Sequence, residues 1–259
     1  MVSMKTVIFC GGKGTRLREK TVSIPKPMVT IGNKPILWHI MSHYAKYGYK
    51  DFILPLGYKG DVIKNYFYNY KTHQSDFNVN LGSGAVSFHQ DSGSIDWNVC
   101  MSSTGENTLK GARLSRISEW IDTEHFMVTY GDGVSNIDIK GLVDFHIQSG
   151  KIGTFSGVRM PSRFGSVSVD DTGHVLSWQE KPLLTDYINC GFFVFKREFL
   201  DYLSPEASCD LEKEPLEKLA AEGQLSMYRH EGFWQCMDTL RDSIKLNEMW
   251  ESGNAPWCI

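Results

Sequence analysis

The stretch KTVIFCGGKGTRL, residues 5–17, decides the predicted fold of this chain. Residues 5–10 form a short apolar run that predicts a buried β-strand, and Gly11-Gly12 end it at once. Glycines without side chains let consecutive backbone N–H groups approach a phosphate closely. Lys13 and Arg16 add positive charge at the same turn. The stretch therefore predicts a strand followed by a polyphosphate-binding loop.

Two other phosphate-binding motifs do not fit this loop. A dinucleotide fingerprint needs the spacing G-x-G-x-x-G, and Leu17 stands where its last glycine would be. A P-loop needs G-x-x-x-x-G-K-S/T, and the sequence contains no such string. The spacing of the glycines therefore excludes both motifs.

Short apolar runs alternate with amphipathic stretches along the chain, which is typical of βαβ units that feed a parallel sheet. We expect an α/β fold, with a Rossmann-like, mixed and mostly parallel sheet flanked by helices and carrying inserted β-structure. The sequence predicts strands at 5–10, 51–56, 125–130, 152–160, 166–169, 175–179, 190–195 and 225–230, and helices at 36–47, 61–70, 114–121, 139–148, 212–222 and 241–251.

The whole chain, residues 1–259, is predicted to form a single domain, because no long linker, low-complexity tract or internal repeat divides it. Residues 1–3 look like an extension, since a second methionine follows them. The periodicity fades between residues 72 and 110, where we expect an irregular insertion that includes a hairpin. The run DDTG at residues 170–173 predicts a second hairpin turn.

The composition excludes several classes of partner. A formal net charge of −3 gives no sign of the basic face that nucleic-acid binding usually needs. No run of 18 apolar residues could span a membrane, and the N-terminus is too short for a signal peptide. The six cysteines are scattered without metal-ligand spacing, which favours thiols in a reducing compartment. We therefore expect a cytoplasmic protein with neither nucleic acid nor a membrane as its partner.

A rigid basic segment, Pro25-Lys26-Pro27-Met28, follows the glycine loop. Prolines on both sides of Lys26 stiffen the backbone and predict an extended geometry there. A lysine held in this way suits a phosphate, because its ammonium group is a compact point charge. Taken alone, the segment is more typical of an exposed proline-rich turn.

An aspartate at the end of a predicted strand is a candidate for a metal site. Asp132 lies just past the predicted strand 125–130, at the edge where open α/β sheets bind ligands. Mg²⁺ usually takes one or two carboxylates together with phosphate oxygens, so Asp132 could supply one of them. For Asp132 alone, an Asx turn before Gly133 is the alternative interpretation.

The combination GGKGTRL at residues 11–17 and PKPM at residues 25–28 resembles the signature of the nucleotidyltransferases that join a sugar 1-phosphate to a nucleoside triphosphate. Within this superfamily the sequence most resembles the glucose-1-phosphate cytidylyltransferases, over nearly its whole length. The matching stretches follow one another in a single order: GNKPILWHI at 32–40, GYKG at 57–60, TYGDGV at 129–134, QEKP at 179–182, INCGFF at 188–193 and FWQCMDTLR at 233–241.

The resemblance implies roles for individual residues. It implies a catalytic set in which the two aspartates also hold Mg²⁺: Arg16, Lys26, Asp132 and Asp238. It implies a second set that binds the sugar phosphate: Glu180, Lys181, Asn189 and Trp234. The largest implied set surrounds the nucleotide: Phe9, Gly11, Gly12, Lys13, Gly14, Thr15, Arg16, Lys26, Thr108, Arg113 and Gly131.

The resemblance also implies a reaction, the Mg²⁺-assisted in-line transfer of a cytidylyl group from CTP to α-D-glucose 1-phosphate, which gives CDP-glucose for polysaccharide synthesis. Phe9-Cys10 replaces the usual Leu-Ala and Cys190 replaces a glycine, so the same fold could use UTP, dTTP or another sugar 1-phosphate. A third interpretation, a nucleotide-sugar-binding protein without activity, is disfavoured because every catalytic residue is present. The resemblance further implies a homo-oligomer, with residues 66–80 as a candidate contact surface.

Overall fold

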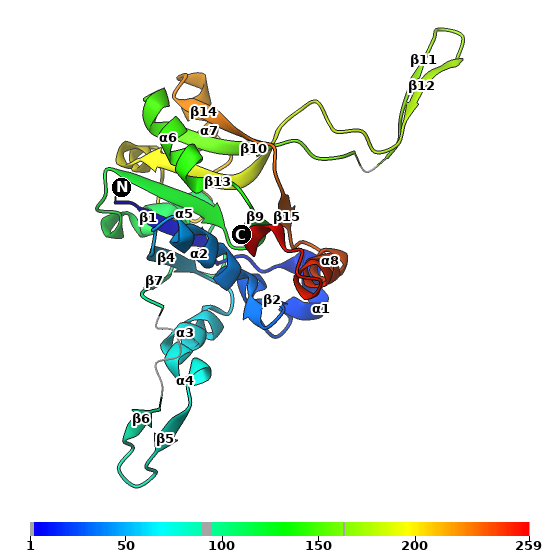
Figure 1. Cartoon of the computed structure of the whole chain (residues 1–259). Helices are drawn as coiled ribbons and strands as arrows, with labels where there is room; N and C mark the ends of the chain where they lie inside the picture. The colour runs from blue at the N-terminus through cyan, green and yellow to red at the C-terminus, as the bar shows by residue number, and fades with distance from the viewer. Residues whose placement is uncertain (1–2, 90–94, 163, 259) are drawn as a thin grey trace.

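The computed structural model describes residues 3–89, 95–162 and 164–258, so the expected extension at residues 1–3 lies mostly outside the described residues. A seven-stranded sheet runs through the protein in the order β14-β10-β13-β8-β1-β4-β7 (Figure 1). β13 runs antiparallel to its neighbours β10 and β8, and the other pairings are parallel. The predicted mixed, mostly parallel sheet is thus confirmed. Its strands are β1 (Lys5–Phe9), β4 (Asp51–Leu56), β7 (Asn98–Ser103), β8 (His125–Tyr130), β10 (Gly153–Val158), β13 (Ile188–Lys196) and β14 (Leu225–His230).

Helices cover both faces of this sheet, and the alternation of side chains along β1 explains why. Ile8 faces one buried cluster, which includes residues of α2 and α6, whereas Val7 and Phe9 face a second cluster, which includes residues of α5 and α7. A strand buried on both faces reads as a continuous apolar run, as residues 5–10 do. The longer helices are α2 (Ile36–Lys46), α3 (Gly60–Tyr68), α5 (Lys110–Arg116), α6 (Ile139–Ser149), α7 (Glu214–Ala221) and α8 (Leu240–Glu251).

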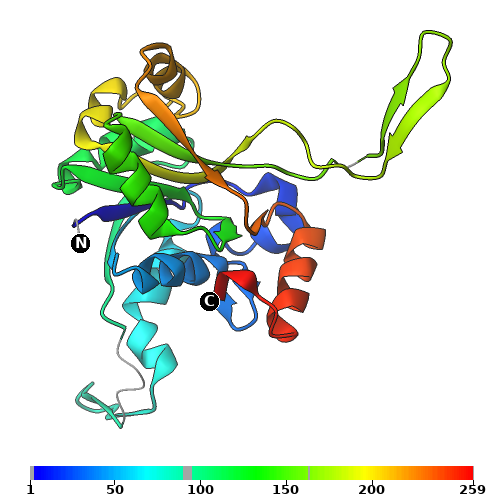
Figure 2. The same ribbon diagram turned by 45° about the horizontal axis from the view of Figure 1, so that its top comes forward.

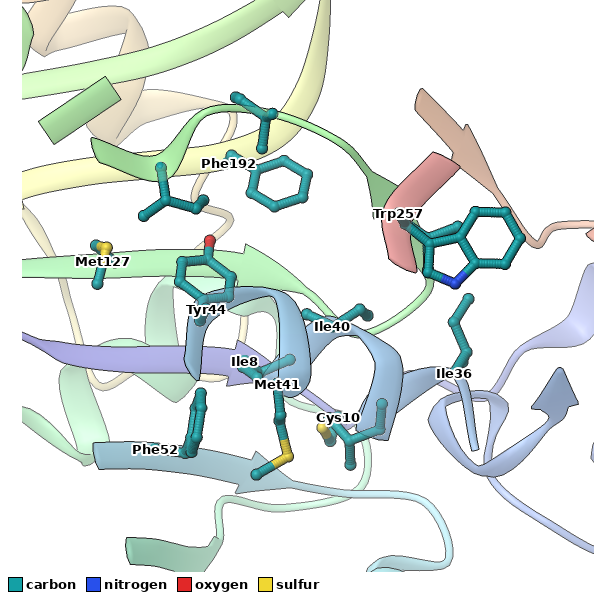
Figure 3. Packing of buried hydrophobic residues seen from close by; sticks show 14 of the residues in the cluster. Ile8, Cys10, Ile36, Ile40, Met41, Tyr44, Phe52, Met127, Phe192 and Trp257 are labelled. Atoms are coloured by element: carbon teal, nitrogen blue, oxygen red, sulfur yellow. The ribbon is translucent and has the colours of Figure 1, made fainter. Parts of the chain in front are cut away.

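The packing of α2 on the sheet forms the centre of the larger cluster. Figure 3 shows Met41 and Tyr44 of α2 next to the strands that carry Ile8 and Phe52. Tyr44 also stacks on Phe192 of β13, with 6.0 Å between the ring centroids. The residues of α2 that face the sheet recur at helical spacing, which is why the sequence predicted this helix.

Two hairpins project from the body on opposite sides of the sheet (Figures 1 and 2). One pairs β5 (Phe77–Val79) with β6 (Val86–Phe88) and follows α4 (Tyr70–Gln74). The other pairs β11 (Ser166–Val169) with β12 (Val175–Gln179) at the end of a long arm. Both hairpins were predicted from the sequence.

The structure differs from the sequence-based expectation in three places. The range 72–110, expected to be irregular, contains β7, a regular edge strand paired in parallel with β4. An edge strand is only partly covered, so it lacks the continuous apolar run that marks a central strand. The helix expected at 114–121 begins earlier, at Lys110. Its first turn carries Gly111, which packs against Cys209, and a glycine weakens the helical signal of the sequence there. The helix expected at 61–70 is divided at Asn69 into α3 and α4.

Within the described residues, no helix is both long enough and apolar enough to cross a bilayer.

A buried histidine pair links α6 to the sheet and gives the fold a pH dependence. His146 Nδ1 lies 2.9 Å from Thr154 Oγ1, and His146 Nε2 lies 3.1 Å from His125 Nδ1. Burial lowers the pKa of His146 to about 4, and burial also lowers the pKa of His125. An unfolded histidine titrates near a pKa of about 6.5, so below that pH the unfolded chain binds protons that the native protein does not bind.

We therefore predict that the free energy of unfolding falls as the pH is lowered from 7 to 5. The decrease should be at most about 1.4 kcal/mol per pH unit for each such histidine. The substitution His146→Gln should flatten this slope, because it removes a group that only the unfolded state protonates. Urea unfolding at several pH values measures the effect. His73→Gln, at an exposed position, is the control and should keep the slope of the wild type. An unchanged slope in His146→Gln would contradict the prediction.

Candidate active site

The glycine loop leaves β1 at the carboxyl edge of the sheet and is shaped by its close neighbours. A Cβ atom at Gly11 would lie 2.1 Å from the guanidinium carbon of Arg113. A Cβ atom at Gly57, on the neighbouring strand end, would lie 2.6 Å from the Gly11 carbonyl oxygen. Gly14 adopts a positive φ of 62°, which turns the chain into the 3₁₀ turn of Thr15–Leu17. These glycines are therefore required by the packing of the loop itself.

Arg113 supports this loop through buried hydrogen bonds to backbone carbonyl oxygens. Its side chain is buried and donates hydrogen bonds to the carbonyl oxygens of Leu56 (2.9 Å), Gly11 (3.1 Å) and Glu106 (3.3 Å). It also donates to Thr104 Oγ1 at 2.7 Å. These four bonds use the terminal N–H groups of the guanidinium, which leaves none of them free for a bidentate contact with a phosphate. Arg113 borders the cleft and braces the loop, and its contact with a nucleotide stays a prediction.

A short pair of strands brings the two candidate metal ligands together. β9 (Gly133–Ser135) pairs antiparallel with β15 (Trp234–Cys236), with Gly133 opposite Cys236. The ladder is extended by the Met237 amide, which donates to the Asp132 carbonyl oxygen at 2.8 Å. Asp132 and Asp238 therefore flank the same end of this pair, although more than a hundred residues separate them in the sequence. The sequence did not predict this pair, because three residues per strand are too few to show periodicity.

Lys26 joins the two carboxylates. Its Nζ atom lies 2.6 Å from Asp132 Oδ2 and 2.5 Å from Asp238 Oδ1, and Arg16 reaches Asp238 Oδ2 at 2.7 Å. Only 9% of Lys26 is exposed. The expected extended geometry of Lys26 is wrong, because the residue begins a 3₁₀ turn, Lys26–Met28, that directs its side chain into this cluster.

The opposite charges in this cluster stabilise the ionised forms of Lys26 and Asp238. Burial alone would lower the pKa of Lys26, but the carboxylates of Asp132 and Asp238 raise it above its ordinary value. Burial alone would raise the pKa of Asp238, but the hydrogen bond from Lys26 and the charge of Arg16 hold it below its ordinary value. Lys26 and Asp238 are therefore both charged at neutral pH.

The two carboxylates fit a magnesium ion. Because both contact one ammonium nitrogen, they lie close enough to share one cation. Nowhere among the described residues, this cluster included, do three or more His, Cys, Asp or Glu side chains gather in a metal-binding group. Mg²⁺ suits a pair of carboxylates, because it keeps several water or phosphate ligands of its own.

These groups border one cleft of about 730 Å³, a volume typical of small-molecule sites. The carboxylate cluster and the glycine loop lie on its walls, and so do further residues that the sequence did not predict, notably Lys110 and Tyr130. Of the predicted site residues, the cleft brings together Phe9, Gly11, Gly12, Lys13, Gly14, Thr15, Arg16, Lys26, Thr108, Arg113, Gly131, Asp132, Asn189, Trp234 and Asp238.

Glu180 and Lys181 lie elsewhere. They follow β12 at the inner end of the hairpin, out along the projecting arm, and both side chains are more than 60% exposed. The described residues that line the cleft include neither of them. Their expected contact with a sugar phosphate is therefore not made within this chain as it is folded here. The sequence placed them on a strand end but could not show the direction in which the arm leaves the body (Figure 2).

The three cysteines near the motif stretches, Cys10, Cys190 and Cys236, have different surroundings. Cys10 is fully buried in the larger core cluster, where burial raises the pKa of its thiol. Cys190 is buried as well, its Sγ atom lies 2.8 Å from Ser156 Oγ, and it borders the cleft. Cys236 borders the cleft beside Asp238, with 3.6 Å between the sulfur and Oδ2. Cys190 and Cys236, rather than Cys10, are therefore placed to influence a bound ligand.

Comparison with known proteins assigns the family. A family model described as nucleotidyl transferase matches residues 5–252. The chain is 47% identical to a glucose-1-phosphate cytidylyltransferase of Salmonella typhi, over 98% of both chains. It is 41% identical to a probable glucose-1-phosphate cytidylyltransferase of Bacillus subtilis, over 99% of this chain and 100% of the relative.

The crystal structure of HddC from Yersinia pseudotuberculosis has a similar fold. The TM-score is 0.69 at 25% identity, over 95% of this chain and 99% of HddC. The family match covers nearly all of the sequence, including the glycine loop, Lys26 and both aspartates. We conclude that the protein belongs to the nucleotidyl transferase family.

Proposed function

We propose that this enzyme transfers a cytidylyl group from CTP to α-D-glucose 1-phosphate and so forms CDP-glucose and pyrophosphate. The relatives that carry this name match the chain over almost its full length. The observation that carries the proposal is the convergence of Asp132, Asp238, Lys26 and Arg16 beside the glycine loop, in one cleft. Such a cluster suits a reaction between two phosphate-bearing substrates.

Different residues of the cleft bind different phosphates during the displacement. Arg16 and the backbone amides of the glycine loop hold the β and γ phosphates of CTP. Lys26 steadies the reacting phosphates as a point charge. A phosphate oxygen of the sugar phosphate attacks the α phosphorus, and pyrophosphate leaves in line with it. No protein nucleophile takes part, because positioning and electrostatic stabilisation dominate this type of transfer.

Magnesium is part of the proposal. Bound by Asp132 and Asp238, Mg²⁺ would supply positive charge that offsets the repulsion between the phosphates of the two substrates. The protein supplies the two carboxylates and the fixed distance between them. We also propose a cytoplasmic location, which agrees with six unpaired cysteines.

The identity of base and sugar is tested directly by a substrate panel. Purified enzyme is given CTP, UTP, dTTP or GTP with each of several sugar 1-phosphates, and pyrophosphate release is measured. We predict the highest kcat/KM for CTP with glucose 1-phosphate. A preference for UTP or dTTP, for which Phe9 at the loop entrance and Cys190 at the cleft are the candidate causes, would contradict the proposal.

The two carboxylates should be essential for turnover but not for folding. We predict that Asp132→Asn and Asp238→Asn each lower kcat about 10²- to 10³-fold, the usual effect of losing a group that stabilises transition-state charge. Chelation of divalent ions should abolish activity, and added Mg²⁺ should restore it. Steady-state kinetics and thermal unfolding measure both effects. Asp201→Asn, at an exposed position in the 3₁₀ turn Arg197–Tyr202, is the control and should behave as wild type. Wild-type turnover in Asp132→Asn would refute the metal assignment.

We further propose that the enzyme is a homo-oligomer. A two-stranded hairpin is marginally stable alone, yet the arm exposes large apolar side chains, among them Leu176 and Trp178, each 67% exposed. The surface expected at residues 66–80 likewise exposes Tyr68. Because Glu180 and Lys181 lie on the same arm, directly after β12, a role for them in catalysis requires the arm to reach a cleft, by closure or by assembly with a second copy.

Light scattering coupled to size-exclusion chromatography tests the assembly. We predict a mass that is a multiple of the 29.4 kDa chain for the wild type. The substitution Trp178→Ser should shift the protein toward smaller species, because it removes apolar surface from the arm. Ile147→Ser, on the exposed side of α6, is the control and should keep the wild-type mass. A monomeric wild type would refute the proposal.

A further inference from the structure

A second polar cluster lies in the cleft, apart from the carboxylates that flank Lys26. It contains Lys110 at the start of α5, Tyr130 at the end of β8 and Asn189 in β13, all of which border the cleft. Behind them stands Glu212, which is not among the described residues that line the cleft. Neither the sequence motifs nor the proposed mechanism gives Glu212 a role.

The hydrogen bonds of this cluster have only one consistent direction. The Gly191 amide can only donate, and it donates to Asn189 Oδ1 at 2.8 Å, so the amide nitrogen of Asn189 faces the other way. That nitrogen donates to the Tyr130 hydroxyl oxygen at 3.1 Å. The Tyr130 hydroxyl must then donate its own hydrogen bond to Glu212 Oε1, which lies 2.5 Å away. The carboxylate of Glu212 therefore fixes the orientation of the Asn189 amide through Tyr130.

The charges in the cluster keep each group in its required state. Burial would raise the pKa of Glu212, but hydrogen bonds from Lys110 and Tyr130 hold it below its ordinary value, so the carboxylate remains an acceptor. Burial and Glu212 raise the pKa of Tyr130, so its hydroxyl remains a donor. Burial and Glu212 also raise the pKa of the neighbouring Asp210. Lys110 pairs with Glu212 and lies 4.7 Å from the centre of the Tyr130 ring.

Glu212 is held in place by the backbone on its N-terminal side. The Ala207 carbonyl oxygen accepts from the Leu109 amide at 2.8 Å, and the Cys209 carbonyl oxygen accepts from the Ala112 amide at 3.1 Å. Gly111 lies between these contacts, and a Cβ atom there would meet the sulfur of Cys209 at 2.7 Å. This segment is thus docked against the beginning of α5, which brings Glu212 to the back of the cleft wall.

We propose that Glu212 is a positioning residue for recognition of the sugar phosphate. Through Tyr130 it holds the Asn189 amide in one orientation, which leaves the second amide N–H of Asn189 for a hydroxyl oxygen of the sugar. Within the described structure this second N–H has no acceptor of its own. The inference rests on the proposed function, because it assumes that a sugar 1-phosphate binds beside Asn189.

The test separates the two substrates. Tyr130→Phe removes the hydroxyl that links Glu212 to Asn189 but leaves the pair of Glu212 and Lys110, and Glu212→Gln weakens the link from the other end. Each should raise the KM for glucose 1-phosphate about 5- to 10-fold, the effect expected from one lost hydrogen bond. The KM for CTP should change less than about twofold, and the double variant should be no worse than the poorer single variant, because both act through one chain of bonds.

Glu217→Gln is the matched control, because Glu217 is an exposed glutamate on the neighbouring α7. It should leave both KM values unchanged. If the cluster is only structural, Tyr130→Phe will raise both KM values together and lower the melting temperature, and that outcome would overturn the proposal. Sugar KM values equal to those of the wild type would overturn it as well.

A set of monodeoxyglucose 1-phosphates gives a second readout. The wild type should discriminate about tenfold against the analogue that lacks the hydroxyl contacted by Asn189, and Tyr130→Phe should lose this discrimination. Equal discrimination in both proteins would refute the role of Glu212. A wild type that forms no CDP-glucose would instead count against the proposed function. Calorimetric titration of glucose 1-phosphate into the same variants then still tests the inference, because it needs no turnover.

Discussion

The short pairing of β9 with β15 is the constraint on which the rest of the site depends. It contains three residue pairs, yet it sets Asp132 and Asp238 at the same end of one ladder. The main sheet positions only the first of these, because Asp132 follows β8, whereas Asp238 comes from a segment beyond the last strand of that sheet. Without the pairing, Lys26 and Arg16 would have a single carboxylate to bind, and no shared cation site would exist.

The sequence predicts those parts of the protein whose signals are local. The inner strands 51–56 and 125–130 were predicted with the bounds that the structure gives, because strands covered on both faces are continuously apolar. The glycine loop was predicted by its spacing and charge. The roles of Asp132 and Asp238 as a pair came from the family resemblance, since nothing local in the sequence joins two residues so far apart.

Features that depend on tertiary contacts were not predictable in this way. Arg113 looked like a phosphate ligand, because a sequence does not show that carbonyl oxygens and a hydroxyl occupy its donors. Glu212 carried no motif, and its importance appears only when Tyr130 and Asn189 are seen beside it. The direction of the arm that carries Glu180 and Lys181 depends on loop geometry, for which the sequence gives no periodic signal (Figure 1).

The contacts of Lys26 and Arg16 with the two aspartates have a consequence for the electrical balance of the cleft. Two positive and two negative side chains cancel one another there. A bare divalent ion would add uncompensated charge to a partly buried place and would compete with an ammonium group already in position. A divalent ion that arrives with a triphosphate brings its own counter-charge, and the phosphates offer new partners to the displaced lysine. The balance among these four side chains therefore favours a divalent ion that enters with a nucleotide over a free ion.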